Sequence, residues 1–137
     1  MTPEGLPKLF AAAFSAQDVK ALTGFLAEDA DVMTLTGAVA ENAGDAQRLF
    51  EAEFAGIFAA ARLVSGKTRL RVLGASGVVL HQRYVVIGAR DAAGAELPRF
   101  GAVLIAVLAA PRWLARGHPD HFSPDPIATW PPRGRLR

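Results

Sequence analysis

The sequence predicts an α+β domain with a curved antiparallel sheet, from the order of its periodic segments. Residues 67–116 form three consecutive strand-like segments, and the apolar residues that precede them recur mainly at helical spacing. Turn-forming sequences rich in Gly, Ala and Asp separate these strands at residues 74–77 and 91–96, and short turns join antiparallel neighbours. The resulting order, two helices, two short strands, a long helix and three strands, is typical of α+β rather than parallel α/β proteins.

Three helices are predicted in the first 60 residues. Apolar residues at i, i+3 and i+4 place the first helix over residues 3–14, with a proline at its entrance. Residues 15–18, Ser-Ala-Gln-Asp, supply an N-cap for a second helix that ends near residue 28. Asp45 is a candidate cap for the longest helix, whose apolar face carries several phenylalanines, and Gly56 indicates close packing or an early helix end.

The strands differ in how far each is expected to be covered. A short strand within residues 30–36 has a candidate partner in residues 38–41. Residues 68–73 alternate polar and apolar side chains, as a half-solvated strand does, whereas residues 100–108 are almost wholly apolar, as in a strand covered on both faces. Residues 112–116 are expected to continue or repeat the last strand.

Composition narrows the functional classes. The 137 residues suit one domain, and 51% of them are hydrophobic. The chain has no cysteine, so disulfides and thiolate chemistry are excluded. A net charge of +2 without a basic cluster in the body argues against nucleic-acid binding, and no apolar stretch is long enough to cross a membrane. The first residues lack a signal-peptide pattern, so we expect a cytoplasmic protein.

The order of motifs resembles a known family. Residues 29–37, Asp-Ala-Asp-Val-Met-Thr-Leu-Thr-Gly, then Gly44 opening a helix, an apolar strand pair and a final strand with Trp113 are similar to the SnoaL-like branch of the nuclear transport factor 2-like superfamily. The likeness is greatest to its SgcJ/EcaC group and covers about residues 5–122. It implies a domain over residues 1–122 with a cone-shaped curved sheet wrapped around three N-terminal helices. Where that group usually has an arginine after the helix-opening glycine, this chain has Asp45.

The resemblance also implies a mainly apolar pocket between the helices and the sheet. We predict that Thr34, Gln82, Tyr84 and Trp113 line it and bind a ligand. This assumes a strand phase in which these side chains, and not their neighbours along each strand, point into the pocket. On the alternative reading, these side chains face solvent or a second subunit.

Candidate catalytic residues follow the last predicted strand. In His118-Pro119-Asp120-His121, Asp120 could orient His118 or His121, and that histidine would act as the acid or base on a small hydrophobic substrate. The same segment fits known metal-ligand spacings poorly, so we expect no metal and no cofactor. A solvent-exposed turn remains the simplest interpretation.

Two classes of function therefore stay open at this level. One is a pocket protein for a small hydrophobic metabolite, acting as a non-catalytic binder or by cofactor-free acid/base chemistry. The other is a dimerisation module with a filled pocket and no ligand. A homodimer is expected because the outer face of the strands at 78–87 and 100–108 is too apolar for water. The tail, residues 123–137, holds four of the nine prolines and is not expected to form regular structure.

Overall fold

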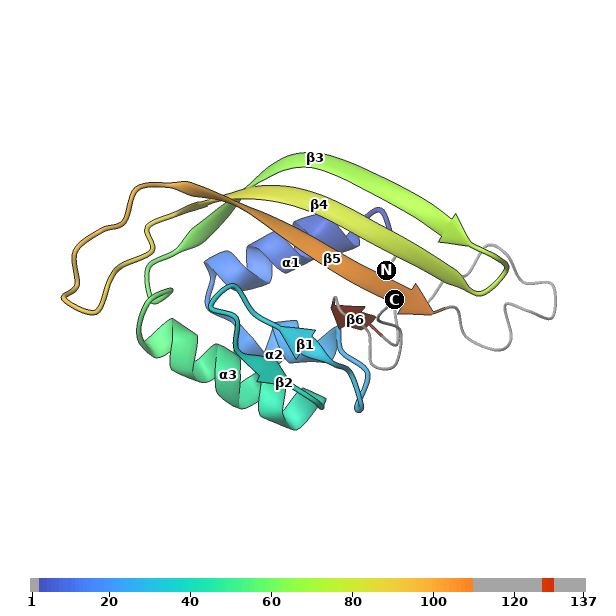
Figure 1. Ribbon diagram of the computed structural model, residues 1–137, viewed down its shortest axis with the longest axis horizontal. Coiled ribbons are helices and arrows are strands. Elements are labelled where there is room, and N and C mark those ends of the chain that lie inside the picture. The colour runs from blue at the N-terminus through green and yellow to red at the C-terminus, as the bar shows by residue number, and fades with distance from the viewer. Residues whose placement is uncertain (1–2, 110–126, 130–137) are drawn as a thin grey trace.

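A computed structural model describes residues 3–109 and 127–129 of the chain. Its main feature is a long, curved antiparallel sheet that arches over three helices, with a small β-hairpin beside them (Figure 1). The sheet order is β3-β4-β5-β6, and β1 and β2 form a separate two-stranded sheet. This architecture confirms the predicted α+β class with a curved antiparallel sheet.

Strands β3 (Arg62–Leu73), β4 (Gly77–Ile87) and β5 (Phe100–Ala109) form the body of the sheet. Strand β3 begins several residues earlier than predicted, because the chain passes Gly66 in a bulge between Ser65 and Thr68 instead of turning there. On β4, alternate side chains from Val78 to Val86 are buried, so one face of the sheet covers the helices and the other faces outward.

The helices are shorter than the sequence suggested. Helix α1 (Leu6–Ser15) packs against β3, and α2 (Val19–Gly24) is a short helix that Asp18 caps by accepting a hydrogen bond from the Ala21 amide. Helix α3 (Ala43–Ala55) ends at Gly56, which confirms the expected early stop. Among the described residues, no helix is both long and apolar enough to cross a membrane.

The cap of α3 differs from the prediction. Asn42 rather than Asp45 occupies the N-cap position, and its side-chain oxygen accepts a hydrogen bond of 2.8 Å from the Asp45 amide. Asp45 instead lies in the first turn, where a negative charge interacts favourably with the helix dipole. Asp and Asn are both good caps, so their spacing alone did not decide which one would be used.

Strands β1 (Val32–Met33) and β2 (Val39–Ala40) form a hairpin that lies between α3 and the sheet (Figure 1). Gly37 makes the turn with a φ of 86°, a conformation that side chains rarely adopt. The turn is closed by backbone hydrogen bonds from the Thr34 amide to the Ala38 carbonyl and from the Gly37 amide to the Thr34 carbonyl.

Strand β6 (Ile127–Thr129) pairs with the outer edge of β5 and corrects the expectation for the tail. Its three residues lie between two prolines, and two of them are β-branched, so a short edge strand forms where proline content argued against one. The strand predicted over residues 112–116 lies outside the described residues.

The core has two parts. One cluster joins the three helices and includes Phe14, Leu22, Phe50, Phe54 and Phe58. The other joins α1 to the sheet through Leu6, Leu80, Tyr84 and Leu108. Phe10, Phe25 and Leu63 pack against both clusters, so the two parts meet along these three side chains.

Candidate functional site

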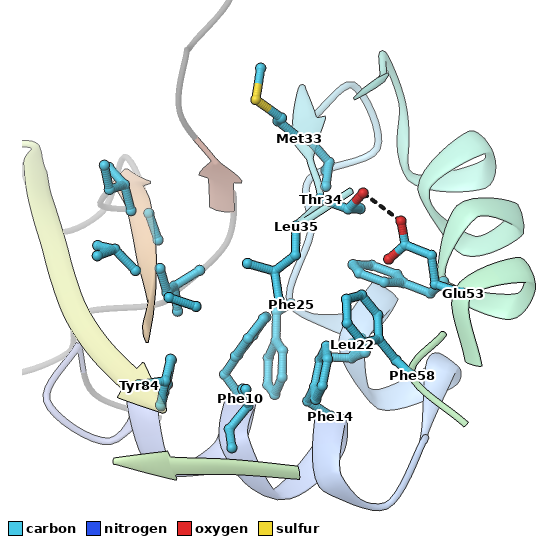
Figure 2. Close-up of a pocket in the computed structure, with 18 of the residues that line it drawn as sticks. Phe10, Phe14, Leu22, Phe25, Met33, Thr34, Leu35, Glu53, Phe58 and Tyr84 are labelled. Carbon is cyan, nitrogen blue, oxygen red and sulfur yellow. Dashed lines mark hydrogen bonds between the residues drawn. The ribbon is translucent and has the colours of Figure 1, made fainter. Parts of the chain in front are cut away.

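A cavity of about 270 Å³ lies where the two parts of the core meet. Figure 2 shows its walls: side chains from α1 and α2 below, β4 and β5 on one side, and α3 with the β1–β2 hairpin on the other. Close-packed interiors leave few voids larger than one water molecule, so a hollow of this size is a feature of the fold. Met33 and Leu35, each 44% exposed, also line it and mark a side that opens toward solvent.

The wall is strongly aromatic. Six of the lining residues carry rings, namely Phe10, Phe14, Phe25, Phe50, Phe58 and Tyr84. Several of these rings contact one another directly, with Phe10 stacked on Tyr84 at 6.1 Å between centroids and Phe14 tilted against Phe58 at 5.5 Å. Ring contacts of this kind hold the side chains in place, so the wall is preformed.

Tyr84 contributes its ring to the cavity, while its hydroxyl is committed elsewhere. The hydroxyl donates a buried hydrogen bond of 2.7 Å to the Pro7 carbonyl on α1. Burial raises the pKa of the Tyr84 hydroxyl well above its usual value, because the charged phenolate is poorly solvated there. Tyr84 therefore stays protonated and ties β4 to α1.

Glu53 is the charged side chain among the described residues that line the cavity. It is 9% exposed, and its Oε2 accepts hydrogen bonds of 2.6 Å from Thr34 Oγ1 and 2.7 Å from Thr36 Oγ1 (Figure 2 shows the first). Both donors come from the turn of the β1–β2 hairpin, so the carboxylate also fastens that hairpin to α3. The two hydroxyls offset part of the cost of placing a carboxylate among apolar side chains.

The helical period explains why Glu53 points inward. Ala46, Phe50, Glu53 and Phe54 form the buried stripe of α3, at spacings of three and four residues. Glu53 also lies in the last turn of that helix, where the negative end of the helix dipole disfavours a further negative charge. Both the apolar surroundings and the position in the last turn of the helix therefore destabilise a carboxylate at this site.

The two carboxylate oxygens of Glu53 differ in their surroundings. Both threonine hydroxyls bond to Oε2, and no hydrogen bond to Oε1 is found among the described residues. No buried side-chain oxygen or nitrogen in the described part of the chain lacks a partner, so Oε1 retains access to solvent or to the cavity. One oxygen of Glu53 thus accepts both threonine hydroxyls, and the other accepts no hydrogen bond from the described residues.

The structure brings only some of the predicted site residues together. Thr34 and Tyr84 line the cavity, on opposite walls. Gln82 shares the buried face of β4 with Tyr84, as the assumed strand phase requires, but it does not line the cavity. Its amide nitrogen donates to the Gly66 and Arg83 carbonyls, at 3.1 and 2.8 Å, and its oxygen accepts from Thr68, so the side chain fills the bulge of β3.

The other predicted residues cannot be compared in this way. Trp113, His118 and Asp120 lie outside the described residues. Their predicted roles as a pocket wall and as a catalytic pair stay predictions. Among the described residues there is no group of three or more His, Asp or Glu side chains placed to hold a metal ion.

Glu53 was not predicted as a site residue, although the sequence holds a signal for it. It falls four residues after Leu49 and three after Phe50, within the apolar stripe of the predicted helix. A charged residue inside such a stripe breaks the binary pattern, and breaks of this kind concentrate at functional sites. The partners on the β1–β2 turn could not be predicted, because they depend on how the hairpin packs against α3.

No protein-family model matches the chain, and no curated protein matches its sequence. Solved structures do match. A protein with a cystatin-like fold from Caulobacter vibrioides superposes with a TM-score of 0.71 at 11% identity, over 80% of this chain and 77% of that one. A nuclear transport factor 2-like protein from Novosphingobium aromaticivorans gives 0.56 at 15% identity, over 92% and 75%.

A third similar structure has a suggested activity. It is a proposed polyketide cyclase from Pseudomonas putida, with a TM-score of 0.54 at 16% identity over 82% of this chain and 84% of that one. Identities this low establish the fold and nothing finer. The chain therefore has the cystatin-like fold of nuclear transport factor 2-like proteins.

Proposed function

We propose that this protein binds a small hydrophobic molecule in the aromatic cavity beside Glu53. The observation that carries the proposal is the cavity itself, an apolar hollow with one charged group in its described wall. Binding sites for small molecules are typically concave, mainly apolar and furnished with a few polar groups that fix orientation. The cavity meets each of these conditions.

The size of the cavity limits the ligand. A cavity of about 150 Å³ accepts benzene, so a hollow of about 270 Å³ fits roughly ten to twelve non-hydrogen atoms. This corresponds to one ring with a short chain or to two fused rings. An open side near Met33 and Leu35 would let part of a longer molecule extend outward.

A second candidate function is cofactor-free acid/base chemistry in the same cavity. Glu53 favours it, because it lines the cavity and one of its oxygens accepts no hydrogen bond from the described residues, so it could accept a proton from a bound substrate. The SgcJ/EcaC likeness and the similarity to a proposed polyketide cyclase are consistent with this class of reaction. His118 and Asp120 remain candidates for a further acid or base, and binding is the step that both functions share.

The alternative of a module whose pocket is filled by its own side chains is disfavoured by the volume of the cavity. A blocking substitution separates the two. Ala102 lines the cavity from β5, and Ala102→Trp would place a large side chain in it, whereas Ala12→Trp makes the same change on the exposed face of α1.

The test uses 4-phenylbutan-1-ol, a neutral molecule of suitable size, and measures binding by titration calorimetry. We expect wild type and Ala12→Trp to bind it and Ala102→Trp to lose binding. Absence of binding to the wild type, or equal binding to Ala102→Trp, would overturn the proposal. Circular dichroism would establish that both variants are folded.

We also propose that the protein is a homodimer through the outer face of β4 and β5. Outward-facing Val79 pairs with Val107 and Arg83 with Val103, and the Val103 side chain is 52% exposed. The β5 half of this face carries no charge, while Arg69 and Arg71 lie along β3. A second copy related by a twofold axis would cover the apolar side chains around Val79 and Val107 with those of its partner. Arg83, which lies beside Val103, and the arginines of β3 would surround this apolar part.

Light scattering tests the dimer directly. Val107→Glu places a charge in the apolar part of this face, opposite Val79, and we expect it to convert a dimer at micromolar concentration into a monomer. Leu9→Glu, at another exposed apolar residue on α1, is the matched control and should remain dimeric. A monomeric wild type would contradict the proposal.

A further inference from the structure

We infer that the cavity selects an organic cation, a hydrophobic amine whose ammonium group pairs with Glu53. This rests on the proposed binding function and adds the chemical class of the ligand. The starting point is the balance of charge in the wall. Among the described residues that line the cavity, Glu53 carries a negative charge and no Lys, Arg or His is present.

Several local features oppose the carboxylate and favour a cation beside it. Glu53 lies in the last turn of α3, where the helix dipole is negative, and its neighbours along the stripe are Phe50 and Phe54. The two threonine hydroxyls bond to Oε2 only, so hydrogen bonds within the protein leave Oε1 without a donor among the described residues. An ammonium group would supply that donor together with a neutralising charge.

The aromatic wall favours the same ligand. Ring faces carry a negative electrostatic potential and attract cations, an effect that grows where water is excluded. Phe14, Phe50 and Phe58 line the cavity together with Glu53, and Figure 2 shows the labelled Phe14 and Phe58 on the same side of the hollow as the carboxylate. These rings can contact both the apolar body of an amine and the carbon atoms next to its nitrogen.

An anionic ligand fits poorly. Its charge would meet the carboxylate and the negative end of α3 without a cationic partner among the described lining residues. A neutral alcohol would fit the space and could donate one hydrogen bond to Oε1. We therefore expect affinity in the order amine, alcohol, carboxylic acid.

Three molecules of matched shape test this order without any substitution. 4-Phenylbutylamine is an ammonium ion at pH 7, 4-phenylbutan-1-ol is neutral and 4-phenylbutyrate is an anion. By titration calorimetry we expect the amine to bind about tenfold more tightly than the alcohol, since charge-assisted hydrogen bonds are the stronger ones, and the anion to bind most weakly. Equal affinity of amine and alcohol, or tighter binding of the anion, would overturn the inference.

Glu53→Gln then assigns the preference to one side chain. The amide keeps the shape and an acceptor for the threonine hydroxyls but removes the charge. We expect the variant to lose the preference for the amine while it still binds the alcohol. A preference that persisted in the variant would contradict the role of Glu53.

The outcomes separate the two proposals. If the alcohol binds the wild type and is excluded by Ala102→Trp, the binding function stands whatever the amine does. If no molecule binds, or if Ala102→Trp binds all three as the wild type does, the binding function itself fails and the cation preference fails with it.

Discussion

Glu53 and Gln82 are the two buried polar side chains of the described structure, and they differ in how completely the protein satisfies them. The Gln82 amide makes three hydrogen bonds, all to β3 and β4, and is 1% exposed. Glu53 has its two hydrogen bonds on a single oxygen and lines a cavity. Burial of a polar group therefore does not by itself identify a binding site. An incomplete set of partners next to an empty space is the more informative sign.

The largest difference between the two residues should appear in stability. Gln82→Ala removes a side chain that donates to two backbone carbonyls at the bulge, and we expect the free energy of unfolding to fall by about 2–3 kcal/mol. Ligand affinity should not change, because Gln82 does not line the cavity. Urea denaturation measures the stability and calorimetry measures the affinity. A loss of affinity without a loss of stability would show that Gln82 serves the ligand site and not the fold.

Tyr84→Phe should have a smaller effect on stability. The change keeps the ring in the cavity wall and leaves the buried Pro7 carbonyl without its donor, which should cost about 1–2 kcal/mol. Alcohol binding should be retained, since only the ring of Tyr84 contributes to the wall. If the variant were as stable as the wild type, the contact between β4 and α1 would matter less than its geometry suggests.

The same tyrosine predicts a dependence on alkaline pH. Its pKa in the folded protein is raised above the ordinary value of about 10, so above that pH the unfolded chain releases the proton that the folded chain keeps. The contribution of Tyr84 to the free energy of unfolding is therefore fully present below about pH 10. It falls as the pH rises further, by up to about 1.4 kcal/mol per pH unit. The difference between wild type and Tyr84→Phe, measured by denaturation between pH 9 and 11, isolates the effect. A difference independent of pH would contradict it.

Thr36→Val tests the fastening of the hairpin to α3. Loss of one hydroxyl donor to Glu53 should lower the free energy of unfolding by about 1 kcal/mol. In a Glu53→Gln background the same change should cost less, because a donor to a charged acceptor contributes more than a donor to an amide. A double-mutant cycle by denaturation measures this coupling, and additive effects would show that the hydroxyl acts independently of Glu53.

Glu53→Gln should show the smallest change in stability. Replacing a carboxylate in an apolar, dipole-opposed position by its neutral isostere is expected to leave the free energy of unfolding unchanged or to raise it by up to about 1 kcal/mol. This would contrast directly with Gln82→Ala. A loss as large as that of Gln82→Ala would mean that Glu53 serves the fold rather than a ligand.

The fold was largely predictable because hydrophobic periodicity reports secondary structure directly. The largely apolar runs at residues 78–87 and 100–108 and the spacing of three and four in the long helix distinguish strands from helices, so element order and class followed. The ends of elements were harder to predict, because they depend on a choice between similar residues and on contacts with neighbouring strands. Asn42 caps α3 in place of Asp45, and β3 continues through Gly66 because the bulge is stabilised by Gln82 from the neighbouring strand.

The site was only partly predictable. Strand phase and the family resemblance predicted that Thr34 and Tyr84 face inward. Strand phase does not predict whether an inward side chain contacts a cavity or another side chain. Gln82 meets the bulge and Tyr84 meets both α1 and the cavity. Glu53 was missed because its neighbours in the helix identify a buried face and give no information on the hollow beyond it.

The central claim is that a ligand occupies the cavity with its polar end at Glu53, and an NMR measurement of intermolecular contacts tests it most directly. With 4-phenylbutylamine bound, nuclear Overhauser effects should connect the methylene next to nitrogen to the Thr34 methyl group. They should also connect the phenyl protons to the cavity-facing rings of α1 and to the ring of Phe25, which follows α2. Contacts confined to the outer face of the sheet, at Val79 and Val107, would contradict the account.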